Sequence, residues 1–119
     1  MRQFLAFILV LTACCKTSKL AEKERFIVLN EHKIHVKTSD NGLPIIFVHG
    51  GYLDLEMWNA QVKELKGSYQ TIRFSDLGHG RTIRSKTKMY GYEIINELTN
   101  IYPNDKYVLV GLSWGPCYA

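Results

Sequence analysis

The sequence predicts an α/β fold in which a mostly parallel sheet is flanked by helices. Short apolar runs typical of buried strands alternate along the chain with longer segments whose apolar residues recur at helical spacing. Strands that alternate with helices imply parallel pairing with right-handed crossovers. The chain has 119 residues, of which 46% are hydrophobic and 22% charged, as expected for one ordinary globular domain without repeats or low-complexity segments.

Three strands are expected in the first half of the chain. Phe26–Leu29 is a short apolar run, and Lys33–Lys37 alternates apolar with polar side chains, which is typical of a strand with one buried face. The turn signal Asn41-Gly42 then leads into the apolar segment Pro44–Val48. This last run is expected to be a buried strand.

Two helices and two more strands are expected to follow. The first helix, Asp54–Lys66, ends at Gly67, and the second ends before Pro103. Their apolar positions are Leu55, Trp58, Val62 and Leu65 in the first helix and Tyr90, Ile94, Leu98 and Ile101 in the second. Strands are expected at Gln70–Phe74 and Tyr107–Val110, the latter apolar enough to be fully buried.

A nucleophile-elbow pattern, G-x-S-x-G, directly follows the last expected strand. It consists of Gly111, Ser113 and Gly115 with one residue between each pair. In such an elbow the serine occupies a strained turn between a strand and a helix, and small neighbours let the two backbones approach. The pattern alone is weak, but its position after an apolar strand makes it specific.

Three blocks together resemble the α/β-hydrolase family. Val48–Gly51 resembles the strand end and loop that help to form the oxyanion hole, Ser75–Thr82 resembles the glycine-rich turn Asp-x-Arg-Gly-x-Gly-x-Ser, and Gly111–Gly115 is the elbow. The resemblance runs from about Phe26 to the last residue. It implies the N-terminal portion of an α/β-hydrolase fold, which is incomplete at this length.

The chain departs from the family pattern at three positions. Ser75 stands where the family usually has aspartate, and Leu77 where it often has arginine or proline. Pro116 replaces a small residue after the elbow, where proline is tolerable because it falls in the first turn of a helix.

The resemblance implies a serine hydrolase that acts on an ester, amide or related acyl bond of a small-molecule substrate. Ser113 would be the nucleophile, and the backbone N–H groups of Gly51 and Trp114 would form the oxyanion hole. No cofactor is expected.

In the family's order, the catalytic acid and then the histidine follow the serine. The six residues after Ser113 contain neither. Two hypotheses therefore stand, a serine hydrolase of which this chain supplies the nucleophile, or a non-catalytic truncated remnant anchored at the membrane. The nucleotide sequence beyond the codon for Ala119 would distinguish them. The substrate and the oligomeric state are not specified by these residues.

The four histidines favour other roles. His32 and His35 are three apart on an expected strand and so point to opposite faces, which argues against a shared metal, and no metal site is expected. His49 is expected to be a structural hydrogen-bonding residue. His79, with Asp76 nearby, is the alternative candidate for a base within this segment.

The N-terminus resembles the signal of a bacterial lipoprotein. Met1-Arg2 precedes the apolar run Phe4–Leu11, which is too short to span a bilayer, and Leu11–Cys14 resembles a lipobox. The resemblance implies lipidation of Cys14 and a membrane-anchored protein of the bacterial cell envelope. The alternatives are an ordinary cleaved signal peptide and an N-terminus that is apolar by accident. The expected organisation is a signal peptide over 1–13, a polar tether over 14–25 and the hydrolase portion over 26–119.

The remaining cysteines and the net charge give little further indication of function. Cys15 and Cys117 do not support a disulfide framework, and Cys117 is expected to be a small buried residue. The formal charge of +4 is modest, and the basic cluster after the glycine-rich turn is either a solvated loop or an attractant for anionic groups. That cluster consists of Arg81, Arg84, Lys86 and Lys88. Aromatic residues do not interleave with these charges, so nucleic-acid binding is not expected.

Overall fold

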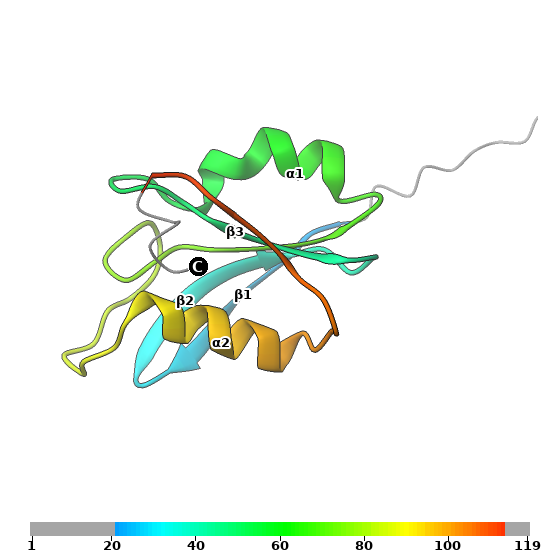
Figure 1. The fold of residues 1–119 in the computed structure, drawn as a ribbon. Coiled ribbons are helices and arrows are strands. Elements are labelled where there is room, and N and C mark those ends of the chain that lie inside the picture. The colour runs from blue at the N-terminus through cyan, green and yellow to red at the C-terminus, as the bar shows by residue number, and fades with distance from the viewer. Residues whose placement is uncertain (1–20, 114–119) are drawn as a thin grey trace, which may run out of the picture.

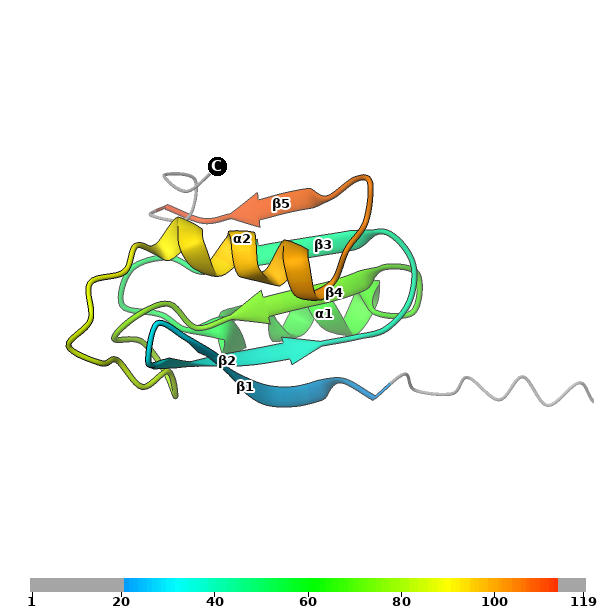
Figure 2. The same ribbon diagram turned by 90° about the horizontal axis from the view of Figure 1, so that it is seen from below.

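The computed structural model describes residues 21–113, and within them a five-stranded mixed sheet carries one helix on each face (Figure 1, Figure 2). The strands are β1 (Lys23–Leu29), β2 (His32–Thr38), β3 (Pro44–Val48), β4 (Gln70–Phe74) and β5 (Val108–Gly111), in the spatial order β1-β2-β4-β3-β5. The helices are α1 (Asn59–Leu65), preceded by the 3₁₀ turn η1 (Leu55–Trp58), and α2 (Gly91–Ile101). Cys14, Cys15, Trp114 and Cys117 lie outside the described residues.

The centre of the sheet is β3, which pairs in parallel with β4 on one side and with β5 on the other. All five residues of β3 are buried, as its continuous apolar sequence predicts for a strand covered on both faces. Ile46 and Val48 face the α2 side, whereas Ile45 and Phe47 face the α1 side. The predicted α/β fold is confirmed, and each element lies within a few residues of its expected position.

The first two strands are antiparallel to each other, and β2 is antiparallel to β4. β1 and β2 are joined by Asn30 and Glu31, both of which have positive φ (47° and 66°). This left-handed pair closes a tight hairpin, and a two-residue connection permits only antiparallel pairing. The parallel pairing expected for the sheet therefore holds for β3, β4 and β5.

The first strand is longer than expected and includes residues before Phe26. β1 starts at Lys23, and Glu22 before it forms a two-pronged ion pair with Arg73 on β4, with distances of 3.1 and 2.8 Å. Lys23 also pairs with Asp40. These contacts hold residues assigned to the tether against the sheet.

The first expected helix is divided into a 3₁₀ turn and a short α-helix. The Asp54 carboxylate accepts the backbone N–H of Glu56 at 2.8 Å and caps η1. The backbone N–H of Leu55 donates to Oγ of Ser75, which fixes the start of the turn against the end of β4. A 3₁₀ turn is common at the start of an α-helix.

The second helix differs from its expectation at one position. Ile94 and Leu98 are buried against the sheet, as their spacing predicts, but the Tyr90 side chain is 51% exposed. Tyr90 is the N-cap residue of α2 with an extended backbone, and its ring stacks on that of Tyr92. The apolar face of α2 thus begins after Tyr90.

β5 is more exposed than its apolar sequence predicts. Val108 and Leu109 are 40% and 44% exposed, because among residues 21–113 this strand has a neighbour only on the β3 side. The expectation of a fully buried strand is corrected for this part of the chain.

Candidate active site

The carboxyl ends of β3, β4 and β5 meet at one end of the sheet (Figure 2). The connection from β3 to β4 runs through α1 on one face, and the connection from β4 to β5 runs through α2 on the other (Figure 1). Neighbouring parallel strands whose connections leave in opposite directions form a topological switch point, where ligands bind in open α/β sheets. Two of the sequence blocks identified above, Val48–Gly51 and Ser75–Thr82, and the described part of the third, Gly111–Ser113, lie at this end.

Ser113 immediately follows β5 in a strained backbone conformation. Its φ is +56°, in the left-handed region that non-glycine residues seldom adopt. The backbone N–H of Leu112 donates to the carbonyl of Val48 at 3.2 Å, which extends the β3–β5 pairing up to the serine. The predicted turn at Ser113 therefore lies beside the end of β3.

Gly50 lets the two strand ends approach. A Cβ atom at this position would lie 3.3 Å from the Leu112 carbonyl oxygen and 3.6 Å from Cβ of Ser113. At Gly51, by contrast, a Cβ would meet no atom within 4 Å. Of the two adjacent glycines, Gly50 is therefore the one at which the strand ends come close, and no signal in the sequence separates it from its neighbour.

Gly51 is exposed and borders the pocket described below, whereas Trp114, the second expected oxyanion donor, is outside the described residues. The following residue, Tyr52, also has a positive φ, of 61°, and its side chain is fully exposed. The backbone of this loop thus turns sharply directly after β3, and the N–H of Leu53 donates back to the carbonyl of Gly50 at 3.3 Å.

His49 connects this loop to the end of β4. Its Nδ1 donates to the carbonyl of Gly50 at 2.8 Å, and its Nε2 accepts the backbone N–H of Asp76 at 2.9 Å. The ring is buried, and both nitrogens are used. The structure thus bears out the structural hydrogen-bonding role predicted for His49.

The glycine-rich turn packs closely on the start of η1. Gly80 has φ +51°, and a Cβ there would lie 2.8 Å from both Cβ of Asp54 and Oγ of Ser75. Ser75 is fully buried, and its carbonyl accepts the Thr82 hydroxyl at 2.6 Å. The backbone of Ser75 therefore bonds within the turn, while its hydroxyl, the group that departs from the family pattern, accepts the N–H of Leu55 at the start of η1.

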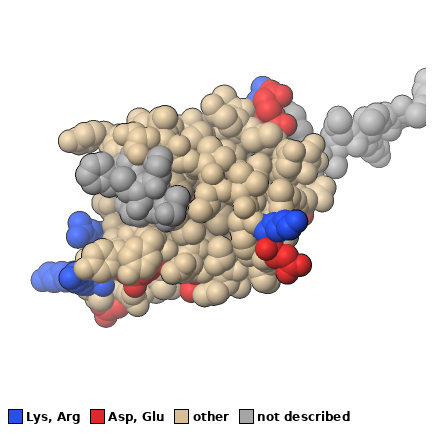
Figure 3. Space-filling model, viewed as in Figure 1, with Lys and Arg blue, Asp and Glu red and all other residues tan. Residues whose placement is uncertain are grey.

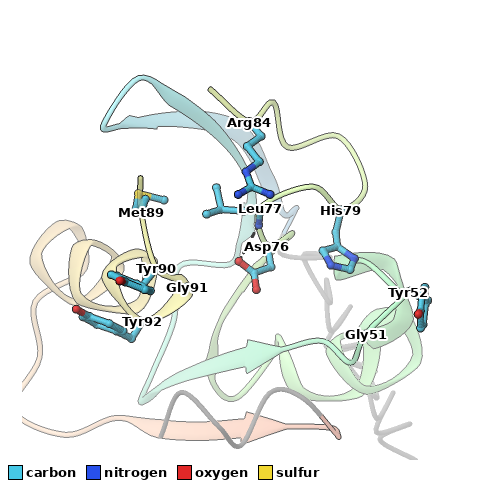
Figure 4. A pocket seen from close by; sticks show the side chains of 10 residues that line it. All are labelled: Gly51, Tyr52, Asp76, Leu77, His79, Arg84, Met89, Tyr90, Gly91 and Tyr92. Carbon is cyan, nitrogen blue, oxygen red and sulfur yellow. Dashed lines mark hydrogen bonds between the residues drawn. The ribbon is translucent and has the colours of Figure 1, made fainter. Parts of the chain in front are cut away.

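His79 projects from this turn toward the pocket (Figure 4). Its Nδ1 donates to the carbonyl of Leu53 at 3.0 Å, and its ring lies 4.9 Å from that of His49. The bond to the Leu53 carbonyl requires a hydrogen on Nδ1 and does not involve Nε2. Asp76 also borders the pocket, and its Oδ1 accepts the N–H of Leu77 at 2.7 Å.

A pocket of about 560 Å³ opens beside these loops (Figure 4). Its walls come from the loop after β3, the long loop after β4 and the first residues of α2. The described lining residues are Gly51, Tyr52, Asp76, Leu77, His79, Arg84, Met89, Tyr90, Gly91 and Tyr92. Ser113 is not among them, but it lies beside Gly50, the residue that directly precedes the lining residue Gly51.

The other two histidines are separated, as the strand spacing predicts. Nδ1 of His32 accepts the N–H of Ser85, and its Nε2 donates to the carbonyl of Thr87, both at 2.9 Å. His35 instead donates from Nε2 to the Glu24 carboxylate. No group of three potential metal ligands is present among residues 21–113.

Two ion-pair clusters hold the scaffold beneath the site. Arg73 is almost fully buried and, besides Glu22, donates to the Leu55 carbonyl at 3.0 Å and to Asn59 at 2.5 Å. The sequence shows an arginine within an apolar strand but gives no sign of a partner 51 positions earlier.

The second cluster is centred on the Glu24 carboxylate, which accepts bonds of 2.6 Å from His35 and from Arg81. The hydrogen bond from His35, together with the charges of Lys37 and Arg81, lowers the pKa of Glu24 from its usual 4.5. The pKa of Glu56 is likewise lowered, by the hydrogen bond from Lys37.

The family comparisons agree with this arrangement. The sequence model described as alpha/beta hydrolase fold matches residues 44–117. Pimeloyl-[acyl-carrier protein] methyl ester esterases of Legionella pneumophila are 29% identical to the chain over 86 residues, which is 72% of this chain and 34% of theirs. The chain thus spans about a third of the length of these curated relatives.

Solved structures share the fold. Epoxide hydrolase VrEH1 from Vigna radiata superimposes with a TM-score of 0.72 at 22% identity over 82% of this chain and 33% of its own. A thioesterase domain from the curacin biosynthetic pathway gives 0.74 at 20% identity over 83% of this chain and 40% of its own. No helix between residues 21 and 113 is both long and apolar enough to cross a membrane.

Proposed function

Because the chain belongs to the α/β-hydrolase family, we propose that it supplies the nucleophile and the oxyanion loop of a serine hydrolase that cleaves an ester, amide or related acyl bond. The observation that carries this proposal is the position of Ser113, in the left-handed region directly after a parallel strand and beside Gly50. A strained strand-to-helix turn is the means by which this fold exposes its nucleophile.

In the proposed reaction, Oγ of Ser113 attacks the carbonyl carbon and a base takes its proton. The negative charge that develops on the carbonyl oxygen would be met by the backbone N–H groups of Gly51 and Trp114. The C–O or C–N bond then breaks, the leaving group is protonated, and water releases the acyl group from Ser113. The acid and the histidine that drive these proton transfers would follow Ser113 in the family's order.

The relatives and structural neighbours differ in the bonds for which they are named. The esterases and the thioesterase domain are named for acyl bonds, whereas the epoxide hydrolases with the same fold are named for a different one. A fold alone does not determine the reaction, and the residue at the elbow carries more information. A serine hydroxyl at this position favours attack on a carbonyl carbon.

The test is labelling by a fluorophosphonate, a probe that reacts with activated serines. The chain joined to in-frame downstream sequence that supplies an acid and a histidine should be labelled at Ser113. Ser113→Ala should remove the label, and Ser68→Ala, which changes an exposed serine after α1, should keep it. Label that survives Ser113→Ala would refute the assignment of the nucleophile.

We further propose that Cys14 carries a lipid that anchors the protein to the bacterial cell envelope. The sequence Leu11–Cys14 supports this proposal, and it lies outside the described residues. Several acyl chains would anchor stably, since each buried CH₂ adds about 0.8 kcal/mol. In bacterial cells grown with labelled palmitate, the chain should take up label and Cys14→Ser should lose it. Cys15→Ser serves as the control that should retain it.

A further inference from the structure

The basic cluster after the glycine-rich turn does not act as one unit, because its members have different surroundings. Arg81 is bound to the Glu24 carboxylate, and Nζ of Lys88 lies 5.2 Å from the centre of the Tyr90 ring. Arg84, in contrast, borders the pocket. The charge of this loop is therefore divided between structural contacts and the pocket wall.

Arg84 is also distinct from the other arginines. Arg73 and Arg81 each bind a carboxylate, and Arg25 lies over the ring of Tyr102 at 5.2 Å. The side chain of Arg84 forms no ion pair with any carboxylate among residues 21–113. Within the described part of the chain, no ion pair therefore occupies the guanidinium group of Arg84.

The backbone on both sides of Arg84 is fixed to β2. Ile83 exchanges two backbone hydrogen bonds with Lys33, of 2.8 and 2.9 Å, and the N–H of Ser85 donates to the buried ring of His32. Because both neighbours are held, the backbone position of Arg84 is set before any ligand arrives, which reduces the entropic cost of binding. Figure 4 shows its side chain reaching toward Leu77 and Asp76.

The side chains that line the pocket with Arg84 offer apolar and aromatic surface, which suits the non-polar part of a ligand. Met89 is buried at the pocket edge, and Tyr90 and Tyr92 stack with ring centres 5.8 Å apart at the start of α2. The one carboxylate among the described lining residues, Asp76, accepts the Leu77 N–H. The pocket therefore combines aromatic and apolar surface with a guanidinium group that can bind two anionic oxygens at once.

We propose that this pocket is the specificity site for substrates that carry an anionic group, a carboxylate or a phosphate, on an apolar or aromatic stem, and that Arg84 is the residue that selects the charge. This inference rests on the proposed hydrolase function for its biological meaning. The binding preference itself does not need a working catalytic site, so it can be tested on the 119-residue chain.

The experiment is a titration followed by NMR shifts of the tyrosine rings and of the Arg84 side chain. The probes are 4-phenylbutyrate, phenethyl phosphate and the neutral 4-phenylbutyramide. We expect at least one of the two anions to bind about tenfold more tightly than the amide, as a charge-assisted hydrogen bond to arginine would give. Which anion binds more tightly then identifies the preferred group.

Arg84→Gln should remove the preference for the anions, and Arg84→Lys should retain part of it, since lysine keeps the charge but not the planar fork. Arg25→Gln removes the same charge outside the pocket and should leave the preference intact. Equal binding of all three probes, or an equal loss in both glutamine variants, would overturn the proposal. Ser113→Ala should not alter the titration, so a failure of the nucleophile assignment is distinguishable from a failure at Arg84.

Discussion

The two sides of β3 differ in how firmly they are held. On the β4 side, hydrogen bonds and ion pairs link β1, β2 and the long loop after β4, including the buried contacts of Arg73 and His32. On the β5 side, the described chain offers one strand with exposed Val108 and Leu109 and the bond from Leu112 to Val48. Within residues 21–113, the pocket wall therefore rests on the side of β3 with more such contacts, whereas Ser113, the proposed nucleophile, lies on the side with fewer.

The largest expected effect is on the rate of hydrolysis, which should depend on Ser113 on the β5 side of the sheet. The 119-residue chain alone should hydrolyse p-nitrophenyl acetate on the order of 10⁴-fold or more slowly than a form supplied with an acid and a histidine, because a serine without a positioned base is a weak nucleophile. Hydrolysis by the short chain well above background and dependent on Ser113 would contradict this expectation. His79 would then be the first residue to replace.

The second prediction concerns the stability of the β4 side of the sheet, where Arg73 is buried. Arg73→Ala should lower the free energy of unfolding by about 3 kcal/mol, because it leaves the Glu22 carboxylate and two further acceptors without their buried donor. Urea unfolding followed by circular dichroism measures this loss. Arg25→Ala, at an exposed arginine, should change it by less than about 0.5 kcal/mol. Similar losses in both variants would show that the buried cluster is not the stabilising element.

A third, smaller effect separates two neighbouring glycines. Gly50→Ala should cost about 1 kcal/mol, since the added methyl would be pressed against the Leu112 carbonyl, while Gly51→Ala meets open space and should cost nothing measurable. Amide exchange at Leu112 gives a local readout and should quicken only in the first variant. Equal exchange in the two variants would mean that the strand ends are not in close contact.

The smallest expected effect is a pH dependence at Glu24. Its pKa is lowered in the folded protein, so its contribution to stability is present above the unfolded value of 4.5 and is lost as the pH falls through the lower folded value. The difference in unfolding midpoint between the natural chain and Glu24→Gln should therefore be visible at pH 7 and shrink below about pH 4.5. A difference that grows on acidification would contradict the assigned sign.

The sequence predicted the regular elements well because apolar periodicity is a local signal. The run Pro44–Val48 and the spacing of Ile94 and Leu98 led directly to a buried strand and a helix face. The contacts between distant segments carried no such signal. No residue near Arg73 in the sequence indicates that Glu22 is its partner, and none near His32 indicates that Ser85 donates to its ring.

The location of the candidate site in the fold was predictable for the same reason. The segments expected to form the elbow and the oxyanion loop are contiguous motifs, and their place at the carboxyl ends of the strands follows from parallel pairing. Their mutual contact through Gly50 and the pocket position of Arg84 depend on how loops fold back on the sheet. Those two features could be identified only from the structure.

The hairpin of β1 and β2 has a consequence for the order in which the domain assembles. Its strands are joined by two residues. In contrast, β3 pairs with distant segments, with Pro44 opposite Gln70 on β4 and Ile45 opposite Val108 on β5. A hairpin forms in about 1–10 μs, while pairings between distant segments first require long loops to close. The hairpin is therefore expected to form early and to offer β2 as the edge onto which β4 docks, so that the central strand β3 and then β5 join a template already in place.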